Sequence, residues 1–493
     1  MENTFLNEMK QINNVDLTEN GGITRKTTNS KVLDMFSLGG AYRNRSDADV
    51  ILLFQNAIEE NAVLAIKCLF YLRDVRGGQG ERRFFRVAFK WLCITYPKIA
   101  RKNLVNVSDF GRWDDLIYAT EGTPLQDEAF DIIKMQLALD CQCKTPSLLA
   151  KWLPSQNASN EETKRLGRLL AAHLGLTSKQ YRKVLSYLRN QINIVERLMS
   201  ENRWDEIEFD KIPSRAGMIY KNAFARRDLI AKKYEEFAKN TNTKVNAKVL
   251  YPQDIAHKVF AERVPSYEDL RRLMLQKYWD NLKDYYQGRK ENGIAVVDTS
   301  GSMYGAPLEA AVSLGAYIAD KAHGPFAHHF ITFSDKPSLV EFEGIDIYHK
   351  FRKCRDAQWG FFTNIEAVFD MLLTTAKRKC VKKEDMPTRL YIFSDMEFNH
   401  CVTTRSGSCC SEYNINTDLE IIRKQWAAEG YELPQVIFWN LDARHNHIPA
   451  IGEGFSYVSG FSPSMIECIL SGKDGYDLML EKLMSDRYAI ITV

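Results

Sequence analysis

The chain has 493 residues, more than the roughly 300 that one hydrophobic core usually serves, so we expect at least two domains. Its residues are 45% hydrophobic and 26% charged with a net charge of +3, which is typical of globular proteins and excludes a disordered or fibrous chain. No segment approaches the ~18 uninterrupted apolar residues of a membrane span, and the polar start is unlike a signal peptide, so the sequence predicts a soluble protein with no membrane partner.

Residues 46–288 carry the pattern of a helical domain, preceded by an N-terminal extension at residues 1–45. Ser46 followed by Asp49 resembles a capping box that opens the first helix. Apolar residues between Phe85 and Leu92 recur at helical spacing, and the breaks between such segments are short. We therefore expect an α-solenoid or irregular α-helical array of HEAT-like type, without a strict sequence period.

After residue 288 the pattern changes to short runs of branched and aromatic residues that alternate with amphipathic segments of helix length. This alternation is typical of a parallel sheet covered on both faces, so residues 289–493 predict a doubly wound domain, whose ligands bind at the carboxyl ends of the strands. The expected strands are Ile294–Val297, Phe330–Phe333, Leu390–Phe393, Val436–Trp439 and Tyr457–Val458. The expected helices are Pro307–Lys321, Asn364–Ala376, Asp418–Ala428 and Tyr476–Met484.

Oxygen-bearing side chains stand beside two of these strands. Asp298, Ser300 and Ser302 come directly after the first strand, Asp395 ends the third, and Thr363 opens a helix between them. Hydroxyl and carboxylate oxygens are the ligands that hard cations prefer. We expect these five residues to hold a divalent cation, Mg²⁺ or Mn²⁺, with one position left for an outside acidic group.

This set resembles the metal-ion-dependent adhesion site of von Willebrand factor A domains, and the resemblance covers roughly residues 290–493. It implies the A-domain fold, binding of the ion partly through water, and a protein partner whose acidic group completes the shell. Two alternatives remain open. Asp298 and Ser302 could cap the following helix, or Glu397 and His400 could act as bases of a metal-dependent hydrolase.

Charge divides the chain at residue 290. Residues 1–290 hold 47 Lys and Arg against 36 Asp and Glu, a net +11, and residues 291–493 hold 19 against 27, a net −8. Residues 161–290 alone hold 27 against 17, a net +10. A basic surface attracts polyanions such as nucleic acids. The alternatives are solvated helix faces, or a basic half that docks on the acidic half.

Three segments of the helical region resemble the TROVE module of Ro-type ribonucleoproteins, in which a ring of helical repeats is followed by an A domain. They are Leu69–Arg82, Phe110–Leu116 and Lys211–Asp228. The whole chain resembles more closely a related family of unknown function with the same two parts, including FSDMEF at Phe393–Phe398 and VIFWNL at Val436–Leu441.

The resemblance implies that the helical module binds structured or defective RNA, including single-stranded ends. Arg and Lys neutralise phosphates, and flat side chains stack on unpaired bases. The alternative is that Arg73 and Asp74, or Arg112 with Asp114 and Asp115, are paired with one another between helices. For Trp113 the alternative is a place in the core. The candidate RNA contacts are Arg73, Arg76, Arg82, Arg83, Arg112, Arg215, Lys221, Arg226 and Arg227.

Ten cysteines are too few for a disulfide scaffold, and several, such as Cys68, stand in apolar runs, so we expect free thiols and a reducing, cytoplasmic compartment. His400, Cys401, Cys409 and Cys410 match no zinc spacing, which favours a loop with free thiols over a zinc site.

Together these patterns predict a monomeric, two-domain RNA-binding protein without enzymatic activity. The helical module binds RNA, and the metal site recruits a protein partner. Two other functions stay open, namely a scaffold that binds only proteins and a metal-dependent hydrolase.

Overall fold

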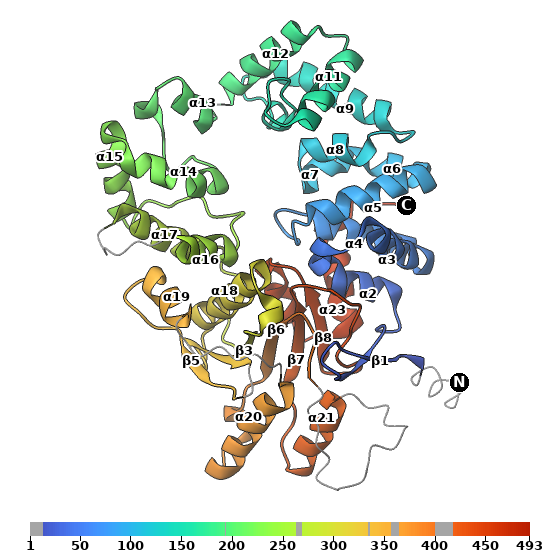
Figure 1. Cartoon of the computed structure of the whole chain (residues 1–493), viewed down its shortest axis with the longest axis vertical. Coiled ribbons are helices and arrows are strands. Elements are labelled where there is room, and N and C mark those ends of the chain that lie inside the picture. The colour runs from blue at the N-terminus through green and yellow to red at the C-terminus, as the bar shows by residue number, and fades with distance from the viewer. Residues whose placement is uncertain (1–12, 193, 263–268, 334–335, 356–363, 400–417) are drawn as a thin grey trace.

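The computed structural model describes residues 13–192, 194–262, 269–333, 336–355, 364–399 and 418–493. The chain forms a long arc of helices, and both ends of the arc rest on a sheet domain (Figure 1). This arrangement confirms the α + α/β layout expected from the sequence. No helix in these ranges combines the length and apolar character that crossing a membrane requires.

The arc consists of helices with short connections. The first begins at the expected capping box, in which the Ser46 hydroxyl accepts the backbone N–H of Asp49 and the Asp49 carboxylate accepts the N–H of Ser46. α5 buries the face between Phe85 and Leu92, as its spacing predicts. The helices are α3 (Asp47–Glu60), α4 (Ala62–Arg73), α5 (Arg82–Thr95), α6 (Pro97–Asn103), α7 (Val107–Phe110), α8 (Trp113–Thr120), α9 (Gln126–Gln142), α10 (Leu149–Trp152), α11 (Glu161–His173), α12 (Ser178–Gln191), α13 (Val195–Ser200), α14 (Ser214–Arg226), α15 (Asp228–Lys239), α16 (Pro252–Ala261) and α17 (Leu270–Asp280).

The sheet domain has six strands in the order β5-β4-β3-β6-β7-β8. All five expected strands are present and pair in parallel, but β5 is an additional antiparallel edge strand, so the sheet is mixed. The strands are β3 (Gly293–Asp298), β4 (His329–Phe333), β5 (Leu339–Glu341), β6 (Arg389–Ser394), β7 (Gln435–Asn440) and β8 (Phe455–Ser459). Its helices are α18 (Ala306–Lys321), α19 (Ile347–Arg355), α20 (Ile365–Lys379), α21 (Asp418–Ala428), α22 (Ile466–Ile469) and α23 (Gly475–Leu483).

Residues that follow α23 fix the first end of the arc. Arg487 donates through Nη2 to Oδ1 of the buried Asp74 at 2.6 Å. The Tyr488 ring stacks on Phe110 with centroids 5.5 Å apart. The C-terminal segment therefore returns to the helical half and holds it against the sheet domain.

Trp279 of α17 fixes the second end. Its ring lies 5.3 Å from that of Phe351 on α19, and its indole N–H donates to Asp320 on α18 at 2.8 Å. Nearby, Arg272 pairs with Asp346, with Nη2 2.8 Å from Oδ1. The arc therefore closes through the sheet domain.

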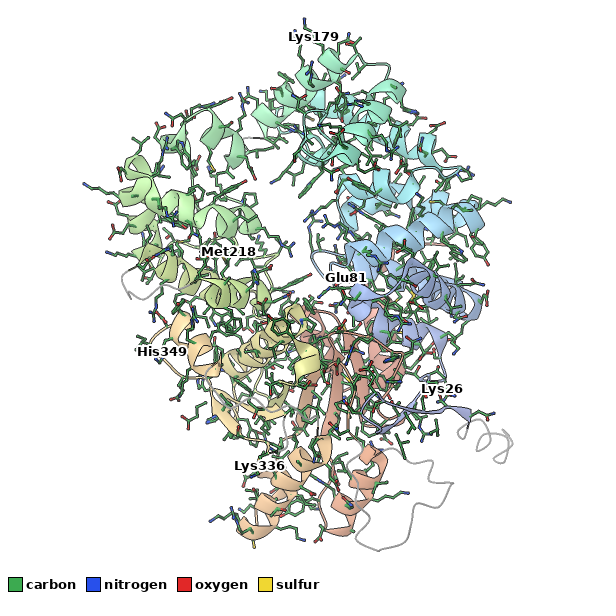
Figure 2. All side chains as sticks on the ribbon, in the orientation of Figure 1. Lys26, Glu81, Lys179, Met218, Lys336 and His349 are labelled. Carbon is green, nitrogen blue, oxygen red and sulfur yellow. The ribbon has the colours of Figure 1, made fainter. Side chains whose placement is uncertain are left out.

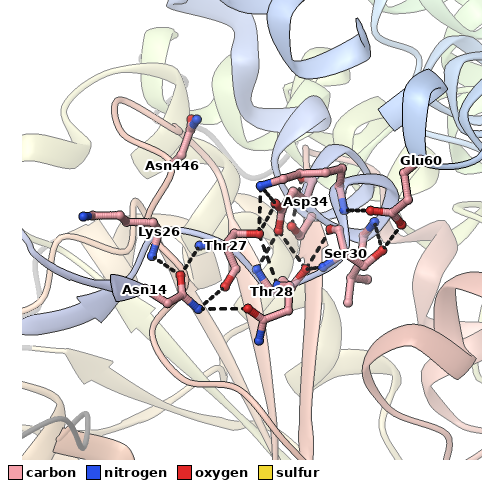
Figure 3. Close-up of polar contacts among 12 residues, drawn as sticks. Asn14, Lys26, Thr27, Thr28, Ser30, Asp34, Glu60 and Asn446 are labelled. Carbon is pink, nitrogen blue, oxygen red and sulfur yellow. Dashed lines mark hydrogen bonds and ion pairs between the residues drawn. The ribbon is translucent and has the colours of Figure 1, made fainter. Parts of the chain in front are cut away.

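The polar network in Figure 3 holds the N-terminal segment against the first helices of the chain. The backbone N–H and the hydroxyl of Thr28 each donate to Asp34 at 2.7 Å, and the Ser30 hydroxyl donates to Glu60 of α3 at 2.6 Å. This network joins a hairpin to the first helices of the arc. The elements are β1 (Val15–Leu17), β2 (Ile23–Arg25) and α2 (Lys31–Leu38).

Candidate functional site

The candidate metal site lies at the centre of the sheet. β3 and β6 are parallel neighbours, with Val297 beside Phe393. The chain leaves β3 toward β4 and leaves β6 toward β7 on the opposite side. The carboxyl ends of β3 and β6 are therefore the topological switch point, where doubly wound sheets form a ligand crevice. Asp298 and Asp395 both stand at this point.

Asp298 is fully buried, and each of its oxygens has a donor. Oδ1 accepts the backbone N–H of Ser300 at 2.9 Å, and Oδ2 accepts the hydroxyl of Ser394 at 2.6 Å. The following helix α18 has Gly305 at its N-cap and no side-chain cap, so Asp298 and Ser302 do not serve as its cap. These two hydrogen bonds instead hold the Asp298 carboxylate at the start of the loop that follows β3.

The hydroxyl oxygens of Ser300 and Ser302 are 3.0 Å apart. Ser300 is buried and Ser302 is exposed. Adjacent ligands of an octahedral ion with bonds of 2.0–2.1 Å are also about 3 Å apart, so the two hydroxyls have the spacing of neighbouring Mg²⁺ ligands. One hydroxyl thus belongs to a buried residue and the other to a residue exposed to solvent.

Asp395 has a cationic partner that the sequence analysis missed. Nη2 of Arg444, in the loop after β7, lies 2.6 Å from Oδ2 of Asp395, and Nη1 lies 2.8 Å from Glu19 in the β1–β2 turn. Because Arg444 already neutralises Asp395, this carboxylate suits a bound water better than the ion itself. The next residue, Met396, has a φ of 67°, a strained conformation of the kind that gathers at functional sites.

The negative charges of Asp298 and Asp395 repel each other. The pKa of Asp298 is raised to about 7, first by burial and then by the negative charge of Asp395, although hydrogen bonds from Ser394 and Ser300 lower it. A divalent cation would relieve both the burial of charge and the repulsion. The hydroxyls and carboxylates present therefore fit Mg²⁺ or Mn²⁺.

Several candidate ligands lie beyond the described residues. They are Thr363, His400, Cys401, Cys409 and Cys410. Within the part of the chain that the structure describes, no three His, Cys, Asp or Glu side chains gather in a way that would hold a metal. A metal site here depends on serine and threonine hydroxyls.

Glu397, the candidate base of a hydrolase, is buried and engaged. Its Oε1 lies 2.9 Å from Nδ1 of His447, and its Oε2 accepts the backbone N–H of Glu19 at 2.8 Å. Burial raises the pKa of Glu397. The hydrogen bonds with His447 and Glu19 lower it by more than burial raises it, so the pKa of Glu397 lies below its usual value. A carboxylate held in this way is a poor acceptor for a substrate proton.

Two of the nine candidate RNA contacts are buried. Arg73 is 1% exposed, with Nη2 2.6 Å from Asp115, and Lys221 is 0% exposed, with Nζ 2.6 Å from Glu262. Assigning these two residues to RNA was wrong, because both side chains are paired inside the arc. Arg73 is thus paired with an aspartate, but with Asp115 and not with its neighbour Asp74, which pairs with Arg487.

Three other candidates, Arg82, Arg112 and Arg215, form what we call the arginine cluster. The pKa of Arg112 is lowered to about 10, mainly by burial. Asp114 opposes this effect, and the positive charges of Arg73, Arg82 and Arg215 add to it. The Arg112 guanidinium lies 4.1 Å from the ring centre of Trp152. Arg82 and Arg112 belong to the α5–α8 arm and Arg215 to α14 on the opposite arm, so the cluster draws its charges from both arms (Figure 1).

The remaining four candidates are exposed on the arc. Arg83 pairs with Asp47, and the Arg227 guanidinium lies 4.8 Å from the ring centre of Trp204. These four are Arg76, Arg83, Arg226 and Arg227.

Some basic side chains of residues 1–290 pair with acidic side chains of residues 291–493, and others do not. Lys283 lies 3.0 Å from Glu467, and His257 lies 2.9 Å from Glu309. Arg82, by contrast, has no ion pair among the described residues. Contacts between the halves therefore leave part of the positive charge available.

Comparison with known proteins places the chain among relatives without an assigned function. A family model described as a domain of unknown function (DUF2828) matches residues 18–119 and 129–298, together more than half of the chain. A second, described as a domain of unknown function (DUF7788), matches residues 292–487. The chain is 31% identical over 505 residues to Uncharacterized protein L728 of Acanthamoeba polyphaga mimivirus, covering 94% of this chain and 85% of that protein.

Proposed function

The chain belongs to the DUF2828 family, and from the geometry of its sites we propose that it is an RNA-binding protein of Ro/TROVE type whose sheet domain is of the von Willebrand factor A type. Asp298, Ser300 and Ser302 hold Mg²⁺ or Mn²⁺, with Thr363 and Asp395 completing the site. An acidic group of a protein partner takes the position that faces solvent. The helical arc binds RNA, and no catalytic step is assigned.

One observation carries the metal part of this proposal. At the switch point of the sheet, a fully buried aspartate stands beside two serine hydroxyls that are 3.0 Å apart, one buried and one exposed. The set offers neutral oxygens and few charges, so a bound dication keeps the ability to attract an outside anion. This favours a site that recruits a partner.

Isothermal titration of the full chain with Mg²⁺ and Mn²⁺ tests the metal site. Asp298→Asn should abolish ion binding, because it removes the charge of a fully buried carboxylate that accepts the backbone N–H of Ser300. Asp442→Asn is the matched control, since Asp442 lies at the same sheet edge but bonds to Asn44. Equal ion uptake by Asp298→Asn and the wild type, with both folded by circular dichroism, would remove the site.

The arginine cluster supports the RNA part. Burial is the main cause of the lowered pKa of Arg112, and the positive charges of Arg73, Arg82 and Arg215 add to it, so the cluster gathers positive charge that a phosphate backbone would stabilise. Trp152 beneath Arg112 adds a flat ring next to that charge, which suits unpaired bases.

Filter binding of single-stranded RNA at several salt concentrations tests this part. The double variant Arg82→Gln/Arg215→Gln should weaken binding and reduce the slope of log affinity against log salt by about 1.4, or 0.7 for each lost phosphate contact. Arg101→Gln is the control, because Arg101 is exposed but pairs with Glu128 at 2.6 Å. If RNA binding is absent while the metal binds, the scaffold function is favoured instead.

A further inference from the structure

A pocket of about 530 Å³ lies where α14, α16 and the first turn of α18 meet. Its apolar part includes the buried Met218 and Leu250, and Ile219, also in its lining, is 63% exposed. Figure 2 labels Met218 on the arm that carries α14. We call it the junction pocket, and its size falls within the about 300–1,000 Å³ of ligand sites.

The junction pocket adjoins the candidate metal loop. Its lining includes Gly305 and Ala306, so it begins three residues after Ser302. Three residues of chain span at most about 11 Å. Tyr304 stands between the loop and the pocket and is 87% exposed. An exposed aromatic ring at such a place is the kind of residue that dominates binding energy in protein interfaces.

The lining of the junction pocket suits a peptide better than RNA. Met218, Ile219 and Leu250 give the pocket an apolar wall that an apolar side chain can contact. Its two cations, Arg215 and Lys258, are balanced by its two carboxylates, Asp254 and Glu309, so the lining has no excess positive charge to attract a phosphate backbone.

We propose that the junction pocket receives a bulky apolar side chain of a protein partner, on an extended segment whose acidic side chain binds the metal. Tyr304 packs against the segment between the two anchors. An extended chain advances ~3.3 Å per residue, so the apolar residue lies within about four positions of the acidic one. This inference rests on the proposed metal site and specifies the sequence that the site selects.

Fluorescence anisotropy with two labelled peptides tests the inference on the full chain in Mg²⁺. Both peptides are Gly-Ser octamers with one Asp, and three positions later one carries Leu and the other Ser. The Leu peptide should bind about tenfold more tightly, because the leucine side chain becomes buried. Equal affinities would overturn the pocket assignment and leave the metal site intact.

Two variants of exposed residues locate the effect without risk to the fold. Tyr304→Ala and Ile219→Ser should each reduce the preference for Leu severalfold while Mg²⁺ affinity stays unchanged. Leu229→Ser, at a side chain 65% exposed on α15, is the control and should keep the preference. If Mg²⁺ does not bind to the wild type, the proposed metal site itself fails. If Ile219→Ser weakens RNA binding and not peptide binding, the pocket belongs to the RNA site and the inference is wrong.

Discussion

Arg444 controls the negative charge that the candidate metal site presents. Its guanidinium bonds to Asp395 and Glu19, which brings the β1–β2 turn next to the carboxyl end of β6. The affinity of an oxygen site for a dication rises with the number of uncompensated carboxylates. The structure therefore suggests that Arg444 weakens metal binding in the free protein.

Replacing Arg444 by Gln should tighten Mg²⁺ binding about tenfold, because a positive charge close to the site is removed and the partly exposed pair is screened by water. Titration calorimetry of the full chain measures the change. Arg423→Gln is the control, since Arg423 donates to the backbone of Glu453. Unchanged or weaker Mg²⁺ binding by Arg444→Gln would show that Arg444 does not oppose the ion.

Arg73 is expected to stabilise the fold without contributing to RNA binding. Arg73→Met should lower the free energy of unfolding by about 3 kcal/mol, because the buried Asp115 loses one of its two arginine partners. Urea unfolding measures this loss. Arg83→Met, at an exposed pair, should change stability by less than about 1 kcal/mol. A fully stable Arg73→Met variant would contradict the structural role.

The sequence cannot distinguish these arginines. Arg73 and Arg82 stand in the same segment and have the same chemistry, yet one is buried with Asp115 and the other has no ion pair among the residues described. The partner of Arg73 is 42 positions away in the chain. Such pairing leaves no local signal, so a pattern of residue types identifies possible contacts and not their exposure.

At the scale of elements, the buried strands were predicted because each is a continuous apolar run. β3, β6 and β7 have almost entirely buried residues. β5 has only three residues, with no fully buried one, and the hairpin strands β1 and β2 are as short. Elements of that length depend on their neighbours for stability, and periodicity does not detect them.

Asp34 provides a pH test of the N-terminal network in Figure 3. Burial raises the pKa of Asp34 above its usual 3.8, and the hydrogen bonds from Thr27 and Thr28 offset this only in part. A raised pKa means that the folded state favours the protonated acid. Its contribution to stability is therefore full below pH 3.8 and is lost as the pH rises through the folded-state pKa.

Asp34→Asn should remove this pH dependence. The free energy of unfolding of the variant relative to the wild type should rise between pH 3.8 and neutral pH, as measured by urea titrations at several pH values. Asp16→Asn, at an aspartate in β1 outside this network, controls for general charge effects. A constant difference between variant and wild type would contradict the burial of an ionisable Asp34.

In the whole molecule, Asp298 and Asp395 were expected at the same edge of the sheet, because parallel strands bring their carboxyl ends to one edge. The closure of the arc through the sheet domain could not be predicted. It depends on Trp279 and on the pair of Arg487 and Asp74, which are separated by 413 positions. Neither contact follows from the pattern of its own segment.

The pair of Arg487 and Asp74 offers a test of that closure. Arg487→Met leaves the fully buried Asp74 with the Tyr488 hydroxyl at 3.1 Å as its remaining side-chain donor, so we expect a loss of about 2 kcal/mol after allowing for the partial exposure of Arg487. Because the pair joins the first end of the arc to the sheet domain, trypsin should also cleave faster after Arg76, in the turn between α4 and α5, and after Arg82, the first residue of α5. Arg203→Met, at an exposed pair with Glu206, should leave both stability and digestion unchanged. Wild-type digestion of Arg487→Met would mean that the stacked rings of Tyr488 and Phe110 hold this joint without the ion pair.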